Sequence, residues 1–343
     1  MSNKIFKEEI KKTTNRELDV PRAILFSLDT LNSKLTLELT LECLFANMQT
    51  DASAVEGWIL VIVSLLKENN VAIKNIEIKT GVSIDEINEY IHNNVNGRLH
   101  LNRLLYRISK FYEQYKGIFN IKISNIPVGT FFYFGNDKKL WYKDMSQFKL
   151  CTNAPDNKSE AQIEHSKFDE MSERDVELSF LKKPQKLFDK LKEIFGNTYN
   201  LIDRQLPVGL FDGRKSENTY IAPGRLAAID LWALSENREK MVVCELKKKG
   251  KKYNEGVGII SELYFYVNVM YDVFINKSIT QTIIKKNIRS YQELLNNKSI
   301  SNVDGVFLVD KLHSQITSSV IDLLNKNSDI RYNVIVYDES YIR

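Results

Sequence analysis

The sequence predicts a mixed α/β protein with two domains, a mainly α-helical N-terminal domain with a few short strands and then an α/β domain. Three observations favour this fold class. The chain has 343 residues, which suits two domains that each bury their own core. A polar stretch near residues 152–169 indicates a linker, and helical and strand patterns alternate after it. We therefore expect domains at residues 1–150 and 170–343, joined by residues 151–169.

The composition is that of an ordinary globular protein, with 43% hydrophobic and 27% charged residues and a net charge of +4. The three cysteines are scattered, which argues against a zinc site or disulfides and favours a reducing compartment. Residues 1–14 lack the apolar stretch of a signal peptide. The longest apolar run, residues 58–66, is far shorter than the roughly 20 residues that span a bilayer. We therefore expect a cytoplasmic protein without a membrane partner.

Two apolar stretches in the first domain, residues 35–48 and 54–67, predict helices that face a core. Residues 73–80 are interpreted as a short helix before a turn at residues 81–83. Ser83 and Glu86 have the spacing of a capping box, which predicts that residues 84–92 form the next helix. This succession of a short helix, a turn and a capped second helix indicates a helix-turn-helix, although any all-α domain contains such turns. A wing of short strands is expected from three stretches, residues 119–124, 130–134 and 140–142.

A basic stripe is expected a little further along the chain. Arg103, Arg107 and Lys110 share one helical face because they are spaced four and three residues apart. Such a stripe is a candidate contact for a nucleic-acid backbone. A solvated helix face explains the same pattern equally well.

The second domain is expected to follow the order helix, three strands, helix, strand. A helix should begin at Ser172 and end before Pro184. Two β-prone runs joined by a polar turn, RLAAIDLWAL and MVVCELK, predict a hairpin. The remaining elements are expected at residues 199–206 (strand), 258–266 (helix), 303–310 (strand), 313–325 (helix) and 331–337 (strand).

The predicted hairpin carries the residues with the most chemical meaning. Asp230 lies among apolar neighbours, where an unpaired carboxylate would be costly. On the second strand Glu245 and Lys247 point to the same side, because side chains alternate along a strand. The alternative is a turn aspartate with two charged residues on a solvated edge strand.

An aspartate on one strand followed by Glu-x-Lys on the next resembles the signature of the PD-(D/E)XK nuclease superfamily. Here the signature reads Ile229-Asp230 and Glu245-Leu246-Lys247, with Ile229 in place of the proline, which does no chemistry. The resemblance covers roughly residues 173–337. It implies a restriction-endonuclease-like αβββαβ core in the C-terminal half and a metal-dependent hydrolysis of nucleic-acid phosphodiesters.

The resemblance also implies roles for individual residues. Asp230, Glu245 and the backbone carbonyl of Leu246 would hold Mg²⁺, for which Mn²⁺ should substitute, because hard cations take oxygen ligands. Lys247 would hold the attacking water near the phosphate. A free lysine has a pKa of about 10.4, so Lys247 would act through its charge or through a lowered pKa. Glu177, in the first helix, is either a further acidic ligand or a solvent-facing residue that the helix dipole favours.

Further positions complete the expected site. Four lysines directly after Glu245-x-Lys247 are candidate nucleic-acid contacts, although a solvated loop would have the same composition: Lys248, Lys249, Lys251 and Lys252. In relatives the helix at residues 258–266 often carries a Gln followed by a Tyr. Here Glu262 or Ser261 holds the Gln position ahead of Tyr266, so the pattern is matched only in part, with Glu262 and Tyr266 as candidate accessory residues.

The expected function is therefore that of an endonuclease in restriction, anti-phage defence or repair, acting on DNA rather than RNA. A homodimer is compatible with the sequence. Two alternatives stay open: a nucleic-acid-binding or regulatory protein that kept the fold and lost catalysis, and a nuclease acting on RNA or single strands. The role in a pathway is analogy from fold to function.

Overall fold

The structure is a computed structural model that describes residues 3–94, 97–134, 140–144, 148–151, 163–164, 167–212, 220–222, 227–248, 256–281, 290–312 and 314–342. By its contacts the chain divides into two compact units. The first comprises Met1–Met145, Gly256–Phe265 and Gln315–Ser328, and the second comprises the rest. Two segments that the sequence analysis assigned to the C-terminal domain, residues 256–265 and 315–328, thus belong to the first unit.

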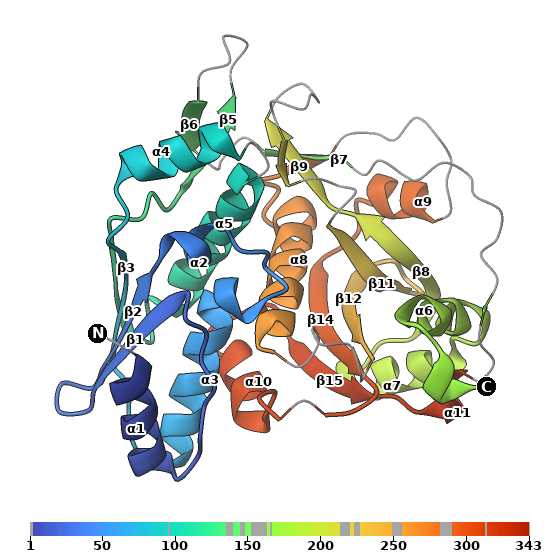
Figure 1. Cartoon of the computed structure of the whole chain (residues 1–343). Helices are drawn as coiled ribbons and strands as arrows, with labels where there is room; N and C mark the ends of the chain where they lie inside the picture. The colour runs from blue at the N-terminus through green and yellow to red at the C-terminus, as the bar shows by residue number, and fades with distance from the viewer. Residues whose placement is uncertain are drawn as a thin grey trace. The chain divides into compact units, whose positions relative to one another are not determined.

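The first unit is built on a four-stranded sheet with the order β1-β2-β3-β4 (Figure 1). The first pair of strands is antiparallel and the others are parallel. Apolar and polar residues alternate along β1 to β3, so one face of the sheet is buried and the other is polar. The strands are β1 (Ile24–Asp29), β2 (Lys34–Leu39), β3 (Asn75–Thr80) and β4 (Asn120–Ser124). A separate antiparallel hairpin is formed by β5 (Thr130–Phe134) and β6 (Leu140–Asp144).

Helices complete the first unit. The longest is α5, and α3 is buried along almost its entire length. Ser83 caps α4 together with Glu86, so the predicted capping box is confirmed. The helices are α1 (Asn3–Thr14), α2 (Leu41–Phe45), α3 (Val55–Glu68), α4 (Ile84–Asn93), α5 (Gly97–Tyr115), α10 (Ser318–Leu324) and the first half of α8 (Gly258–Phe274), with a 3-10 turn at Asp51–Ser53.

Two helix predictions in this unit were wrong, for the same physical reason. The segment interpreted as a helix at residues 35–48 forms most of β2 and the short helix α2. The segment at residues 73–80 contains β3, so residues 73–92 form a strand and a helix rather than a helix-turn-helix. In both segments every second residue is apolar, as in the buried series Leu35, Leu37 and Leu39. This period of two is typical of a strand.

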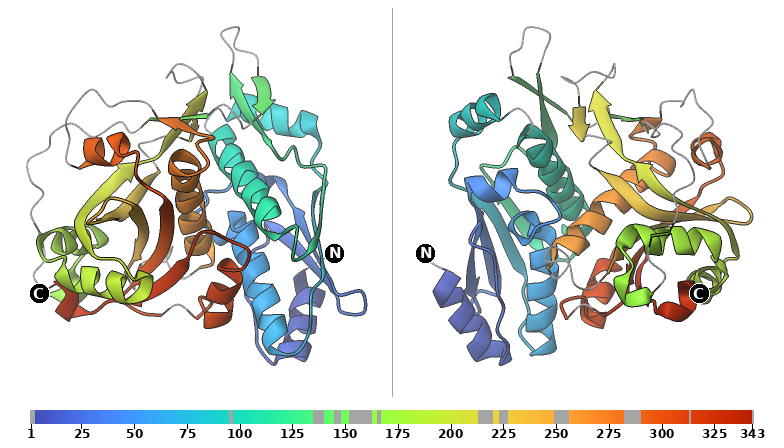
Figure 2. Two further views of the ribbon diagram at one scale, coloured as in Figure 1. Left: turned by 180° about the vertical axis from the view of Figure 1, so that it is seen from behind. Right: turned by 45° about the vertical axis from the view of Figure 1, so that its right-hand side comes forward.

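The second unit contains a five-stranded mixed sheet with the order β15-β14-β12-β11-β8 (Figure 2). Strand β11 runs antiparallel to both β8 and β12, whereas β12, β14 and β15 run parallel to one another. The strands are β8 (Tyr199–Pro207), β11 (Ala228–Ser235), β12 (Lys240–Lys247), β14 (Asn302–Val309) and β15 (Tyr332–Val336). The predicted hairpin and the strands on either side of it are therefore confirmed.

The other elements of this unit surround the sheet. Helices α6 (Glu173–Lys182) and α7 (Gln185–Phe195) cover one face. Trp232, on the other face, packs on Tyr291, and a Cβ at Gly305 would touch Val267 of α8. The remaining helices are α9 (Tyr291–Asn296) and α11 (Glu339–Ile342), with a 3-10 turn at Phe168–Glu170. A small sheet contains β7 (Phe148–Cys151), β9 (Gly209–Asp212), β10 (Tyr220–Ala222) and β13 (Thr280–Gln281).

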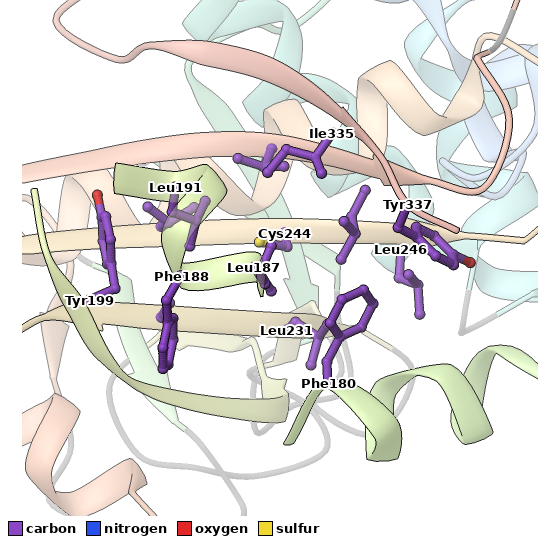
Figure 3. Packing of buried hydrophobic residues seen from close by; sticks show 14 of the residues in the cluster. Phe180, Leu187, Phe188, Leu191, Tyr199, Leu231, Cys244, Leu246, Ile335 and Tyr337 are labelled. Carbon is purple, nitrogen blue, oxygen red and sulfur yellow. The ribbon is translucent and has the colours of Figure 1, made fainter. Parts of the chain in front are cut away.

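The core of the second unit lies between the sheet and helices α6 and α7 (Figure 3). Phe180 and Leu187 from the helices pack on Leu231, Cys244 and Leu246 from the central strands. Because these strand residues fill the helix-covered face, the residues between them in the sequence face the opposite side. The mixed α/β class predicted from the sequence is confirmed. Among the described helices, none is long and apolar enough to cross a membrane.

Candidate active site

The hairpin of β11 and β12 brings Asp230 and Glu245 to neighbouring positions. Leu231 pairs with Cys244, so the antiparallel register sets Asp230 opposite Glu245 at the next position. The Leu246 backbone N–H donates a hydrogen bond to Asp230 Oδ2 at 3.0 Å. This bond links the half-buried Asp230 side chain directly to the strand that carries Glu245.

Glu245 and Lys247 form a close ion pair on one face of β12. Lys247 Nζ lies 2.5 Å from Glu245 Oε1. The Glu245 residue is 1% exposed and the Lys247 side chain 13% exposed, so little water screens this pair. The alternative of a solvated edge strand is therefore wrong, because β12 lies between β11 and β14 and Glu245 is buried.

Glu177 reaches the same region from helix α6. Its Oε2 accepts a hydrogen bond from Arg204 Nη1 at 2.9 Å, and its Oε1 accepts one from Gln205 Nε2 at 2.8 Å. The Gln205 amide also lies 3.4 Å from Asp230 Oδ1. Burial and the negative charge of Asp230 raise the pKa of Glu177 to about 7, against the opposing effect of Arg204.

The position of Glu177 excludes one of the two interpretations of this residue. It is 4% exposed and pairs with a guanidinium, so it is not a solvent-facing residue that serves only the helix dipole. Both carboxylate oxygens accept hydrogen bonds within the site. In this arrangement Glu177 supports Gln205 and lies beside Asp230.

Lys248 anchors helix α6 rather than facing a ligand. Its ammonium donates to the backbone carbonyls of Phe168 and Met171 and lies over the Phe168 ring. The Lys248 backbone N–H donates to Glu173 Oε1 at 3.2 Å. With its side chain buried in this way, the predicted nucleic-acid contact at Lys248 is wrong. The other three lysines of that run, Lys249, Lys251 and Lys252, lie outside the described residues.

The basic residues of α5 also do not form the exposed nucleic-acid contact that their spacing predicted. Arg107 is fully buried, and its guanidinium donates to Glu56 Oε1 at 2.7 Å and to the Ser53 carbonyl at 2.8 Å. Arg103 is buried and donates to the Leu99 carbonyl. Lys110 is half-buried, with its ammonium 5.5 Å from the centre of the Tyr106 ring. Arg103 and Arg107 therefore stabilise the first unit and cannot track a phosphate backbone.

The two accessory residues lie on α8, and both are buried. Glu262 Oε1 accepts a hydrogen bond from Gln49 Nε2 at 2.6 Å, within the first unit. Tyr266 belongs to the second unit. Glu262 is thus bonded to Gln49 on the loop before α3, a structural contact that was not expected from the sequence.

Three residues of the site were missed from the sequence. Arg204 neutralises Glu177, and Gln205 connects Glu177 with Asp230. Tyr291 Oη lies 2.7 and 2.5 Å from the backbone carbonyl oxygens of Arg204 and Gln205, so its one hydroxyl proton can be donated to either. The polar pair Arg204-Gln205 within the apolar end of a predicted strand was a signal for those two residues, whereas no sequence pattern indicated Tyr291.

The oxygen donors of the site suit a hard divalent cation only together with water. In the part of the chain that the structure describes, no group of three or more His, Cys, Asp or Glu side chains is arranged to hold a metal ion. Asp230 and Glu245 supply two neighbouring carboxylates, and Leu246 adds a backbone carbonyl between Glu245 and Lys247. Mg²⁺ commonly takes one or two carboxylates and keeps several waters, so this donor set fits it.

Comparison with known proteins adds no relative. A scan against protein-family models and searches of curated proteins and of solved structures found no match for this chain. The resemblance to PD-(D/E)XK nucleases therefore depends on the residues described above.

Proposed function

We propose that the chain is a metal-dependent endonuclease that hydrolyses phosphodiester bonds of nucleic acid, with DNA as the preferred substrate. The observation that carries the proposal is the grouping of Asp230, Glu245 and Lys247 at adjoining positions of β11 and β12. A buried carboxylate beside a half-buried ammonium costs desolvation free energy, and such perturbed charged pairs are concentrated at functional sites.

The order of the elements supports a restriction-endonuclease-like core. Helix α6 precedes three antiparallel strands, β8, β11 and β12, and helix α8 then leads to the parallel strand β14. This agrees with the αβββαβ order that the resemblance implies. The acidic residue of the first helix, Glu177, reaches the strand that carries Asp230 through Gln205.

The residues suggest a division of labour. Asp230, Glu245 and the Leu246 carbonyl would hold Mg²⁺, which supplies charge neutralisation and makes water more acidic. Lys247, held by Glu245 at 2.5 Å, offers one positive charge and N–H donors to the attacked phosphate or to the water that attacks it. Leu246 N–H fixes the orientation of the Asp230 carboxylate. The low exposure of Glu245 and Lys247 keeps these charges poorly screened.

The proposal is tested with metal-stripped protein and four substrates: supercoiled plasmid, linear duplex, single-stranded DNA and RNA. We expect cleavage with Mg²⁺ or Mn²⁺ and none with EDTA. Asp230→Asn, Glu245→Gln and Lys247→Met should each lower the cleavage rate at least about 100-fold while the protein stays folded. Their effects should not add, because the three groups serve one site. Glu293→Gln, which removes an exposed partner of Arg238 in the same unit, is the matched control.

The outcomes separate the competing functions. Wild-type rates in the Lys247→Met variant would remove the assignment. Salt-sensitive binding without cleavage would favour a nucleic-acid-binding protein that lost catalysis, and cleavage confined to RNA or single strands would favour the other alternative.

A further inference from the structure

The backbone of Gln205 has an unusual conformation for a residue within a strand. Its φ is +52°, in the left-handed region that residues with a Cβ rarely adopt. The register on either side is regular, since Leu206 pairs with Ile229 and Arg204 with Leu231. Gln205 therefore lies opposite Asp230. A left-handed conformation is strained for a residue with a Cβ and persists only where its surroundings hold it.

The left-handed turn directs the Gln205 side chain to two acids from different elements. Its Nε2 is 2.8 Å from Glu177 Oε1 on α6 and 3.4 Å from Asp230 Oδ1 on β11. A primary amide has two N–H groups, so one nitrogen can donate to both carboxylates. Together with Leu246 N–H on Oδ2, this leaves both Asp230 oxygens with a donor that fixes their direction.

Contacts from α9 hold this stretch of backbone. Tyr291 Oη lies within hydrogen-bond distance of the carbonyl oxygens of both Arg204 and Gln205. One residue earlier, Asp203 Oδ2 accepts a hydrogen bond from the Ser290 N–H at 3.1 Å. The Tyr291 ring packs on Trp232, two residues after Asp230 on β11. The strain at Gln205 is thus offset by contacts to the three consecutive residues 203–205.

We infer that Gln205 is a positioning residue of the carboxylate site and that Tyr291 holds the backbone from which Gln205 acts. This inference rests on the proposed function, because the group that Gln205 positions is the candidate metal ligand Asp230. Gln205 orients Asp230 for the cation and keeps Glu177 at a fixed distance from it. Partners of metal ligands typically change metal affinity or activity by 10–100-fold when they are removed.

Gln205→Gly separates the side chain from the backbone. Glycine adopts a φ of +52° without strain, so the variant removes the amide and leaves this backbone conformation accessible. We expect its dissociation constant for Mn²⁺, measured by calorimetry on the metal-free protein, to rise at least tenfold. The cleavage rate at low Mn²⁺ should fall in parallel and recover partly at high Mn²⁺. A purely structural role for Gln205 would leave Mn²⁺ affinity unchanged.

Tyr291→Phe tests whether the Tyr291 hydroxyl holds the backbone of Gln205, with Tyr115→Phe as its matched control. Both substitutions delete one hydroxyl that donates to a backbone carbonyl, since Tyr115 Oη bonds the Leu323 carbonyl at 3.0 Å in the first unit. Both should lower stability by similar amounts, but only Tyr291→Phe should weaken Mn²⁺ binding, by severalfold.

The outcomes distinguish this inference from the proposed function. Wild-type protein that binds Mn²⁺ and cleaves nucleic acid, with a Gln205→Gly variant that binds Mn²⁺ within twofold of it, overturns the inference alone. Wild-type protein that neither binds Mn²⁺ nor cleaves overturns both. Equal weakening of Mn²⁺ binding by Tyr291→Phe and Tyr115→Phe overturns the role of Tyr291 in holding the Gln205 backbone.

Discussion

His100, on helix α5, is a half-buried histidine whose charged form is disfavoured in the folded protein. Arg103 Nη2 lies 2.7 Å from its ring Nδ1. Burial and the charge of Arg103 lower the pKa of His100 to about 4. A histidine in an unfolded chain has a pKa of about 6.5, so below that pH the unfolded chain binds a proton that the folded protein excludes. The contribution to stability is therefore present above about pH 6.5 and is lost as the pH falls towards 4.

We predict that the difference in free energy of unfolding between wild type and His100→Asn depends on pH. Between pH 7 and pH 4, the free energy of unfolding of the wild type should fall relative to the variant by about 1–2 kcal/mol, allowing for partial solvent screening. Urea unfolding at several pH values measures it. His92→Asn, at an exposed histidine of α4, is the matched comparison for replacing an imidazole outside this environment. Parallel curves for wild type and His100→Asn would contradict the prediction.

At the same scale, the candidate site divides into residues that the sequence could indicate and residues that it could not. Asp230, Glu245 and Lys247 follow from alternation on a hairpin, a local property with a fixed period. Gln205 depends on one left-handed φ, and Tyr291 contacts it across 86 residues. Neither the conformation of Gln205 nor the contact of Tyr291 produces a periodic pattern in the sequence. The charges of Arg107 and Lys248 were visible, but their burial depends on distant partners such as Glu56 and Met171.

Among the elements, two strand edges are closed by asparagine side chains. Asn3 of α1 bonds the Ile24 carbonyl and the Phe26 N–H of β1. Asn102 of α5 does the same for Phe132 of β5, accepting from its N–H at 2.7 Å and donating to its carbonyl at 2.8 Å. A side-chain amide thus replaces the peptide group of a neighbouring strand, which protects an otherwise open edge.

Asn102→Leu should therefore be strongly destabilising. Leucine has a similar size but leaves the buried N–H and carbonyl of Phe132 without this partner. We expect a loss of about 2–4 kcal/mol in the free energy of unfolding, since each buried polar group left unsatisfied costs roughly 1–3 kcal/mol. Asn94→Leu, where the amide bonds the Tyr90 carbonyl in an exposed position, should change stability by less than about 0.5 kcal/mol. Similar values for the two variants would contradict the proposed role of Asn102.

Elements with one uninterrupted pattern were predicted well, and elements in short mixed segments were not. Residues 54–67 and the hairpin strands are nearly continuous apolar runs, and each matches an observed element that is buried along most of its length. The segment at residues 35–48 changes from a period of two to a helical turn within a few residues, at the Thr40 cap. A window long enough to detect a helix averages over this change. Thr40 accepts a hydrogen bond from Cys43 N–H, and this cap is what ends the strand pattern.

For the whole molecule, the first unit is discontinuous in sequence. Its internal contacts include segments that lie more than 100 residues after β4. Helix α10 packs on α3, and Ser64 Oγ bonds the Ser319 carbonyl. Asp51 accepts from the Val257 N–H, and Gly258 approaches the Gln49 carbonyl so closely that a Cβ would lie 2.2 Å from it. The sequence could not reveal this arrangement, because a linker-like composition near residue 150 marks where a chain crosses between units and not how often it returns.

A fragment of residues 1–150 should therefore fail to fold as an independent domain. It contains all four strands of the first sheet but lacks α10 and the first half of α8. Without them, the face of α3 that contacts α10 would be exposed, as would Tyr106, whose ring packs edge-to-face on Phe265 at 5.6 Å. Tyr115 and Gln114 would also lose the carbonyls of Leu323 and Leu324 as hydrogen-bond acceptors.

We expect this fragment to unfold without a sharp thermal transition and to bind a hydrophobic dye strongly, whereas the full chain should show cooperative unfolding and little dye binding. Circular dichroism during heating and dye fluorescence at 25 °C measure the two properties. A second fragment provides the control: residues 1–150 joined by flexible linkers to residues 256–265 and 315–328 restores the missing packing and should regain a cooperative transition. If the shorter fragment melts as cooperatively as the linked one, the returning segments contribute little to the core of the first unit. In that case the assignment of residues 1–150 to a self-sufficient domain, made from the sequence, is the better description of how the chain folds.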